Sequence, residues 1–176
     1  MNKLLLSTLV SALVAIAGSA IAEDVGSVQT MVFEGQIHTT NVIGLVPEGL
    51  RLDGHVTGGF TDGPLAGATG EWIDYLLIRH DGVGVVYVRG YFADPDGVPV
   101  ALTFRGFLGA PQPGLVEAML DPEYEMPDED MPVHGAAWLE SMAPQYAFLN
   151  HTVFAATGTV NPGTGVIRAV YRPLAE

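Results

Sequence analysis

The amino-acid sequence predicts a single all-β domain, built as a closed antiparallel β-barrel or as a β-sandwich. Short segments rich in β-branched and aromatic residues recur along the 176-residue chain, and such residues suit a pleated sheet. Turn signals separate these segments, at Asp81-Gly82, residues 93–97 and residues 161–163. No strong helical pattern competes with them. Seven or eight short strands are expected, which is typical of a barrel or a sandwich.

The clearest strands form a meander within residues 70–111. Its strands are expected at residues 75–80, 85–92 and 98–109. Successive side chains of a strand point to opposite sides, so Arg89 shares a side with Tyr87 and Tyr91, while Arg105 shares a side with Phe107. The sequence leaves open whether these sides face the interior or the solvent.

The other strands are expected at residues 28–38, 51–58, 145–157 and 166–172, and the last is expected to pair with the first and remove the sheet edges. Residues 111–142 interrupt this pattern with prolines and a dense acidic run. Prolines stop long helices, so one or two short helices are expected there, at residues 114–120 and 134–142. Such an excursion is usually a loop or lid on a rigid scaffold.

Residues 1–22 have the pattern of a cleaved signal peptide. Lys3 precedes a long apolar run, and Ala20-Ile21-Ala22 forms a cleavage signal. The mature chain is therefore expected to be one barrel domain, residues 23–176, located in the periplasm or secreted. The chain has no cysteine, so its exported form would depend on its core without disulfide bonds.

The charge of the chain narrows the classes of partner. The formal net charge is −13, Lys3 is the only lysine, and every acidic residue follows residue 22. Nucleic acids and anionic membranes both require a basic surface. Neither is expected as a partner after removal of the signal peptide, whereas a small organic ligand and a homo-oligomer remain open.

Three blocks of the chain resemble the domain-of-unknown-function 3237 family. These are VTGGFTDGPLAG, VYVRGYFADPDGVPVALTFRG and PQYAFLNHTVFAATG, in the order found in that family. The chain departs from the family pattern in its signal peptide, in its acidic excursion and in Glu71-Trp72, where the family has an Asp-Trp pair. The resemblance implies an antiparallel barrel of lipocalin or allene-oxide-cyclase proportions with a central cavity. It implies no agreed activity.

Three residues are candidates for catalysis. Arg89 and Arg105 lie on adjacent predicted strands, and a guanidinium group on an inner face could hold a carboxylate or an enolate oxygen. Glu71 is the best carboxylate candidate, because an apolar neighbour such as Trp72 favours a protonated carboxyl group suited to acid–base work. The alternative is that the arginines point into solvent and that Glu71 is a rim carboxylate paired with an arginine.

Six further residues are candidates for ligand binding. The aromatic candidates could line a small-molecule pocket. The other two are Asn150, which lies in the third family-like block, and His151, which directly follows it. The candidates are Trp72, Tyr87, Tyr91, Tyr146, Asn150 and His151.

No cofactor or metal is expected. The five histidines, at positions 38, 55, 80, 134 and 151, lack metal-ligand spacing, and there is no dinucleotide-binding or phosphate-binding motif. The acidic run at residues 121–130 offers oxygen ligands for Ca²⁺ but lacks the EF-hand pattern, and such a run is more often a solvated loop.

The first functional hypothesis is an exported barrel that isomerises, cyclises or eliminates from an apolar or aromatic organic molecule without a cofactor. Arg89 and Arg105 would hold an oxyanion, and Glu71 or a tyrosine would move a proton. Whether the protein is an enzyme stays open, because a periplasmic carrier for a small apolar ligand would have the same features. A third hypothesis is an interaction protein that uses the acidic excursion as its contact.

Overall fold

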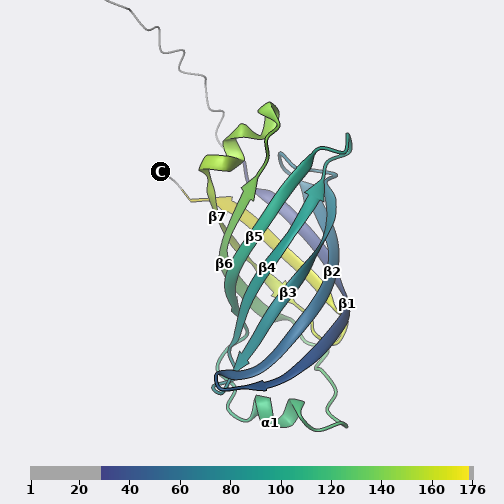
Figure 1. The fold of residues 1–176 in the computed structure, drawn as a ribbon, viewed down its shortest axis with the longest axis vertical. Helices are drawn as coiled ribbons and strands as arrows, with labels where there is room; N and C mark the ends of the chain where they lie inside the picture. The colour runs from purple at the N-terminus through teal and green to yellow at the C-terminus, as the bar shows by residue number, and fades with distance from the viewer. Residues whose placement is uncertain (1–28, 175–176) are drawn as a thin grey trace, which may run out of the picture.

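The computed structural model describes residues 29–174 as one closed barrel of eight antiparallel strands (Figure 1). The predicted signal peptide lies outside the described residues. The elements, in chain order, are β1 Met31–Val46, β2 Gly49–Asp62, β3 Thr69–Arg79, β4 Gly84–Ala93, β5 Pro99–Leu108, α1 Leu115–Met119, β6 Met131–Glu140, the 3₁₀ helix η1 Pro144–His151, β7 Val153–Val160 and β8 Val166–Pro173.

Each strand pairs with its neighbour in the chain, and β1 pairs with β8 to close the barrel. The closing ladder runs from Met31 opposite Tyr171 to Gln36 opposite Val166. This pairing confirms the predicted closure and decides for a barrel over a sandwich. Among residues 29–174, no helix has the length and the hydrophobicity to cross a bilayer.

The two ends of the barrel are closed differently. At the η1 end, the lumen is filled by fully buried side chains, which include Phe60, Phe92 and Phe154. At the opposite α1 end, Leu115 and Val116 pack over the ends of β2 and β3 and form a separate apolar cluster with Leu50, Leu52 and Ile78 (Figure 1). The long connection between β5 and β6, which contains α1, also lies at this end.

The predicted excursion is shorter than expected. The connection between β5 and β6 spans residues 109–130 and contains α1, as predicted, but residues 131–140 form β6 instead of a second helix. Ala137 and Leu139 face the lumen on this strand, and β6 is paired on both sides. Ladder formation and inward burial outweigh the high intrinsic helix propensity of its alanines and Glu140. Helical structure appears later, as η1, within a segment predicted to be β.

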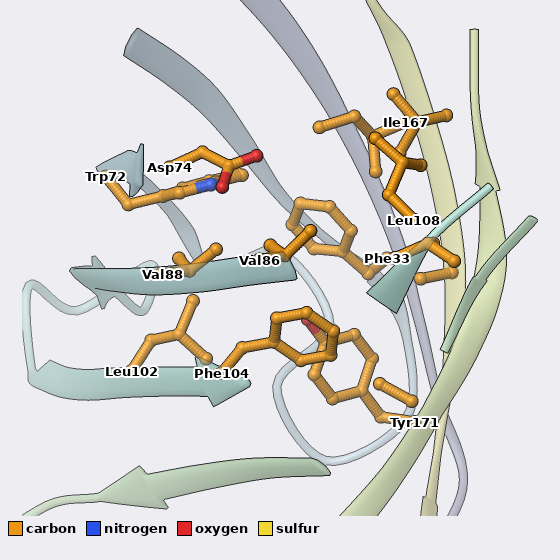
Figure 2. A pocket seen from close by; sticks show the side chains of 14 residues that line it. Phe33, Trp72, Asp74, Val86, Val88, Leu102, Phe104, Leu108, Ile167 and Tyr171 are labelled. Carbon is orange, nitrogen blue, oxygen red and sulfur yellow. The ribbon is translucent and has the colours of Figure 1, made fainter. Parts of the chain in front are cut away.

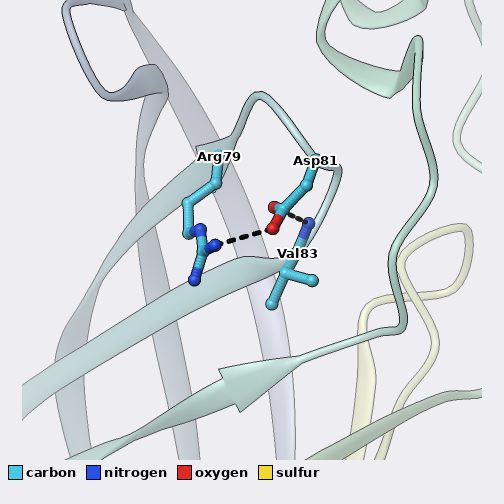
Figure 3. A network of polar contacts seen from close by, with 3 residues as sticks. All are labelled: Arg79, Asp81 and Val83. Atoms are coloured by element: carbon cyan, nitrogen blue, oxygen red, sulfur yellow. Dashed lines mark hydrogen bonds and ion pairs between the residues drawn. The ribbon is translucent and has the colours of Figure 1, made fainter.

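The turn between β3 and β4 shows how a local sequence signal fixes a hairpin. Asp81 Oδ2 forms an ion pair of 2.6 Å with Arg79, and its Oδ1 accepts a hydrogen bond from the backbone N–H of Val83 (Figure 3). Gly82 adopts a φ of 85°, which is easy for glycine and strained for other residues. The predicted Asp81-Gly82 turn therefore lies where the sequence placed it.

Candidate functional site

A cavity of about 60 Å³ lies inside the barrel (Figure 2). Its lining is apolar apart from the carboxyl group of Asp74, the hydroxyl group of Tyr171 and the indole nitrogen of Trp72. The lining residues are Phe33, Trp72, Asp74, Val86, Val88, Leu102, Phe104, Leu108, Val133, Ala156, Val160, Ile167, Ala169 and Tyr171.

The cavity extends toward the α1 end. Leu108 and Val160 end β5 and β7 at that end of the barrel, and Ile167 lies near the start of β8 there. Val133 and Ile167 keep partial exposure, whereas the η1 end is filled by the core. The α1 end is therefore the less densely filled end of the lumen.

Asp74 is the one carboxyl group in the lining. It lies on β3 two residues after Trp72, so both side chains point inward. Its partners on the neighbouring strands are Gly54 and Val88. Gly54 has no side chain to compete for space: a methyl group there would lie 3.6 Å from Asp74 Cβ.

The environment of Asp74 favours its protonated form. Its Oδ1 is buried and has no hydrogen-bond partner among the described residues. Burial raises the pKa of Asp74 from 3.8 to about 7, and the charge of Asp53 on the adjacent strand adds to this effect. A carboxyl group that titrates near neutrality can both accept and donate a proton at physiological pH.

Tyr171 brings a second polar group to the same cavity from β8. Figure 2 shows its ring across the lumen from Asp74, with the hydroxyl group beside Phe104. Within residues 29–174 the hydroxyl group has no hydrogen-bond partner, and burial alone raises its pKa far above the usual value. It therefore stays a neutral O–H donor. Buried polar groups normally have partners, so both Asp74 and Tyr171 have unused hydrogen-bonding capacity in one apolar space.

Trp72 forms the wall beside Asp74 and belongs to an aromatic cluster. Its ring contacts Phe33 and Phe92 at centroid distances of 5.3 and 5.8 Å. Its partner on β4 is Gly90, where a methyl group would lie 2.3 Å from Trp72 Cβ. The backbone oxygen of Glu71 would lie 2.4 Å from the same methyl group, so the glycine permits the close approach of β3 and β4 beside Trp72. Trp72 is thus the sequence-predicted ligand-binding residue that does line the cavity.

The predicted arginines lie on the outer face of the barrel. Arg89 and Arg105 are exposed, and the lumen is lined instead by the alternate residues of β4 and β5, which include Val86, Val88 and Phe104. The hypothesis of an inner-face arginine pocket is therefore wrong for both residues. A guanidinium group inside this apolar lumen would lose its hydration without compensation.

Tyr87 and Tyr91 accompany the arginines outside. The guanidinium carbon of Arg105 lies 4.9 Å from the centre of the Tyr87 ring, within the range of a cation–π contact. Tyr91 is exposed. The grouping of these residues on one side was predicted, but that side faces away from the cavity.

Glu71 also faces outward. Its Oε2 lies 3.6 Å from Nε2 of His55, and 54% of its side chain is exposed. Trp72 was expected to be an apolar neighbour of the Glu71 carboxyl group. Its ring does not contact this group, because adjacent residues of a strand point to opposite sides.

The three predicted residues of the last block lie in or at the end of η1, at the opposite end of the barrel from α1. Tyr146 donates a hydrogen bond of 2.7 Å to Asp94. Asn150 bonds the backbone N–H and C=O of Ser141. His151 is exposed. None of them lines the cavity, and the first two hold loops together.

The sequence contained a signal for Asp74 that the expectation missed. Within WIDYLLI, residues 72–78, Asp74 is the only acidic residue, and it alternates with Trp72. If a tryptophan is assigned to the interior, the period of two assigns Asp74 there as well. Tyr171 gave no comparable signal, because a tyrosine near a chain end suits either face.

No group of three or more histidine, aspartate or glutamate side chains forms a potential metal site within the part of the chain that the structure describes. His38 and His55 do come together on the outer face, with ring centroids 6.2 Å apart. His38 Nε2 lies 2.7 Å from Thr57 Oγ1 and is occupied by this contact.

Comparison with known proteins gives a family whose function is not assigned. A family model described as "Protein of unknown function (DUF3237)" matches residues 28–173. No curated protein matches the chain.

Solved structures share the fold at low sequence identity. A conserved protein of unknown function from Rhodopseudomonas palustris is 19% identical, with a TM-score of 0.62 over 83% of this chain and 97% of that one. A β-barrel-like protein from Acinetobacter baumannii is 20% identical, with a TM-score of 0.59 over 82% and 92% of the chains. A protein from Penicillium herquei described as an enzyme is 13% identical, with a TM-score of 0.53 over 81% and 92%.

Proposed function

Because the chain belongs to the DUF3237 family of proteins of unknown function, and because its lumen holds a carboxyl group with one buried oxygen that has no hydrogen-bond partner among residues 29–174, we propose that it moves a proton on a small, largely apolar organic molecule without a cofactor. The observation that carries the proposal is Asp74, whose Oδ1 is buried in an apolar cavity and finds no partner in the part of the chain that the structure describes. The description of a protein of the same fold as an enzyme is consistent with it.

The chemistry follows from the two polar groups of the cavity. Ionised Asp74 takes a proton from a carbon atom next to a carbonyl group and later returns it to another carbon, so the product is an isomer. Tyr171 donates a hydrogen bond to the oxygen atom, on which negative charge develops when the C–H bond breaks. Isomerisation is the simplest of the three predicted reaction types, since one acid–base group completes it.

The size of the cavity limits the substrate. A water-sized sphere needs roughly 10–15 Å³, so about 60 Å³ accommodates a molecule of roughly four to six heavy atoms. The apolar lining favours a compound whose only polar group is the carbonyl. A larger aromatic substrate would require side chains at the α1 end to move.

The test is proton exchange in solution. The mature chain is incubated in D₂O with a panel of small ketones and unsaturated ketones, and deuterium incorporation and isomerisation are followed by NMR. The wild type accelerates at least one of these reactions, and Asp74→Asn lowers the rate at least about 100-fold. Glu34→Gln, which removes an exposed carboxylate from β1, is the matched control. Equal rates for wild type and Asp74→Asn would contradict the proposal.

The second candidate function is that of a carrier, which binds a small molecule without changing it. It is favoured by the lining, in which apolar side chains outnumber polar ones and would hold a ligand by burial alone. A carrier would show saturable ligand shifts by NMR but no exchange or product. In that case Asp74→Asn would weaken the affinity and nothing else.

Export is a separate part of the proposal. It is supported by Lys3, the apolar run and the Ala20-Ile21-Ala22 signal. The full chain produced in a Gram-negative host is expected in the periplasmic fraction, with Glu23 as its first residue by N-terminal sequencing. A cytoplasmic protein that retains residues 1–22 would contradict this part alone.

A further inference from the structure

A groove of about 510 Å³ lies on the outer wall of the barrel, over β4, β5 and β6, and the proposed lumen chemistry does not use it. These three strands are neighbours in the sheet (Figure 1). We call this hollow the outer groove. Its walls are two successive outward rows of the ladder. Tyr87 and Arg105 form one wall, and Phe107 and His134 form the other.

The floor of the outer groove is backbone. The residues between the two walls are Val86, Gly106 and Gly135, and alternate residues of a strand point to opposite sides, here toward the lumen. A methyl group on Gly106 or Gly135 would lie 2.6 or 2.8 Å from the ring of Phe104 inside the barrel. A molecule in the outer groove therefore lies on the paired strands, with side chains on two sides.

The spacing of the two walls fits one flat ring. Residues two positions apart in a strand are about 7 Å apart, and stacked carbon atoms need roughly 3.5 Å on each side. Three of the four wall side chains are aromatic, and the rings of Phe107 and His134 lie 5.8 Å apart with an interplanar angle of 38°. One aromatic ring placed between the walls can therefore contact both of them.

Arg105 brings a positive charge to this aromatic site. Its guanidinium carbon lies 4.9 Å from the centre of the Tyr87 ring, a cation–π contact that holds the group beside the outer groove. Among residues 29–174 Arg105 forms no ion pair, whereas Arg51 and Arg79 are each paired with an aspartate. Its N–H groups can therefore donate two parallel hydrogen bonds to a carboxylate.

The acidic charge of the whole chain acts only weakly at this site. The outward carboxylates of β3–β6 are Glu71 and Glu140. Each lies four residues along its strand from the row of Arg105, since that row contains Tyr75 on β3 and Ala136 on β6. This separation is about 14 Å, beyond the screening length of about 8 Å at physiological salt. Arg105 therefore sets the local preference, which is for an anion.

We infer that the outer groove binds a small aromatic carboxylate, with the ring between the two walls and the carboxylate on Arg105. The site lies on the opposite side of the barrel wall from Asp74. The inference goes beyond the proposed lumen chemistry and does not depend on it.

NMR titration of the purified mature chain with 2-naphthoate tests this site. The amide signals of Gly106 and Gly135 are expected to shift saturably. Two matched probes separate the parts of the ligand: 2-naphthamide keeps the flat rings without the charge, and cyclohexanecarboxylate keeps the charge without a flat ring. Each is expected to bind at least about tenfold more weakly than 2-naphthoate. Equal binding of either probe would overturn the assigned ligand class.

Variants of the two outer arginines locate the carboxylate. Arg105→Gln should raise the dissociation constant for 2-naphthoate at least about tenfold, and Arg105→Lys, which keeps the charge but loses the planar fork, should raise it less. Arg89→Gln is the matched control, because Arg89 is exposed but does not line the outer groove. It should stay within about twofold of the wild type.

Circular dichroism reports whether each variant is folded. The absence of saturable shifts at millimolar 2-naphthoate, or equal affinity of the wild type and Arg105→Gln, would overturn the inference. Asp74→Asn should leave the shifts of Gly106 and Gly135 unchanged. Their loss in Asp74→Asn would place the ligand in the lumen and would also overturn the inference.

Discussion

The hydroxyl group of Tyr146 donates a hydrogen bond of 2.7 Å to Oδ2 of Asp94 and so joins η1 to the turn between β4 and β5. Asp94 Oδ1 accepts two backbone N–H groups of that turn, from Asp96 and Val98. These bonds, with Tyr146 the largest contribution, hold the pKa of Asp94 below its usual value. A residue expected to bind a ligand is instead the link that closes the η1 end of the barrel.

Tyr146→Phe is expected to lower the melting temperature by a few degrees at neutral pH, because the carboxylate of Asp94 loses a partly buried donor. A carboxyl group whose folded pKa is lowered stabilises the fold above its unfolded pKa, and this stabilisation is lost as the pH falls through the folded value. The difference between variant and wild type should therefore shrink below the ordinary aspartate pKa of 3.8. Thermal melts at several pH values measure it, and a constant difference down to strong acid would contradict it.

Asp74 predicts the opposite pH dependence. Its folded pKa is raised, so the folded state binds a proton that the unfolded state has released between 3.8 and about 7. Stability should fall with rising pH across this window, by roughly 4 kcal/mol in total. Asp74→Asn should remove this contribution and be more stable than the wild type at alkaline pH. Urea unfolding at several pH values across this window measures the free energy of unfolding of the wild type and of the variant. If it depends on pH in Asp74→Asn as it does in the wild type, Asp74 is not the group responsible.

Tyr171→Phe separates the hydrogen-bond donor from the proton carrier. Loss of the hydroxyl group should lower the exchange rate by about 100-fold. The rate should still rise with pH around the Asp74 pKa of about 7, because the base is unchanged. Folding stability should stay equal or increase, since the hydroxyl group has no partner inside the barrel. A rate equal to that of the wild type would show that Tyr171 does not contact the substrate.

Glu71→Gln distinguishes the sequence-based expectation from the lumen site. Glu71 and Asp74 lie three residues apart on β3 but on opposite sides of the barrel wall. If the lumen is the site of chemistry, Glu71→Gln should keep the rate within about twofold, far from the effect of losing an acid–base group. If Glu71→Gln lowers the exchange rate as much as Asp74→Asn does, Glu71 takes part in the reaction.

Gly90→Ala should destabilise the barrel because the new methyl group would lie 2.3 Å from Trp72 Cβ. The methyl group would also lie 2.4 Å from the backbone oxygen of Glu71, so β3 and β4 must shift apart, and such overpacking costs roughly 1–3 kcal/mol. Gly54→Ala is the matched control: its methyl group would meet Asp74 Cβ at an ordinary 3.6 Å. Denaturant titrations compare the two, and equal effects would show that β3 and β4 separate at this point without cost.

Much of the barrel could be predicted from the sequence. The strand from Val85 to Phe92, the Asp81-Gly82 turn and the pairing of the last strand with the first follow from local patterns and from the need to remove sheet edges. The helix expected at residues 134–142 was wrong, because Ala136 and Ala137 locally favour a helix and only pairing with β5 and β7 selects the strand.

The sequence by itself determined which side chains share a side: Arg89 lies with Tyr87 and Tyr91, and Asp74 lies with Trp72. Only the closed barrel decided which side is inside. A period of two residues fixes alternation but not its direction, and the direction is set by the side that fills the lumen best without burying charge. As a result, the arginines face the solvent and Asp74 faces the apolar cavity.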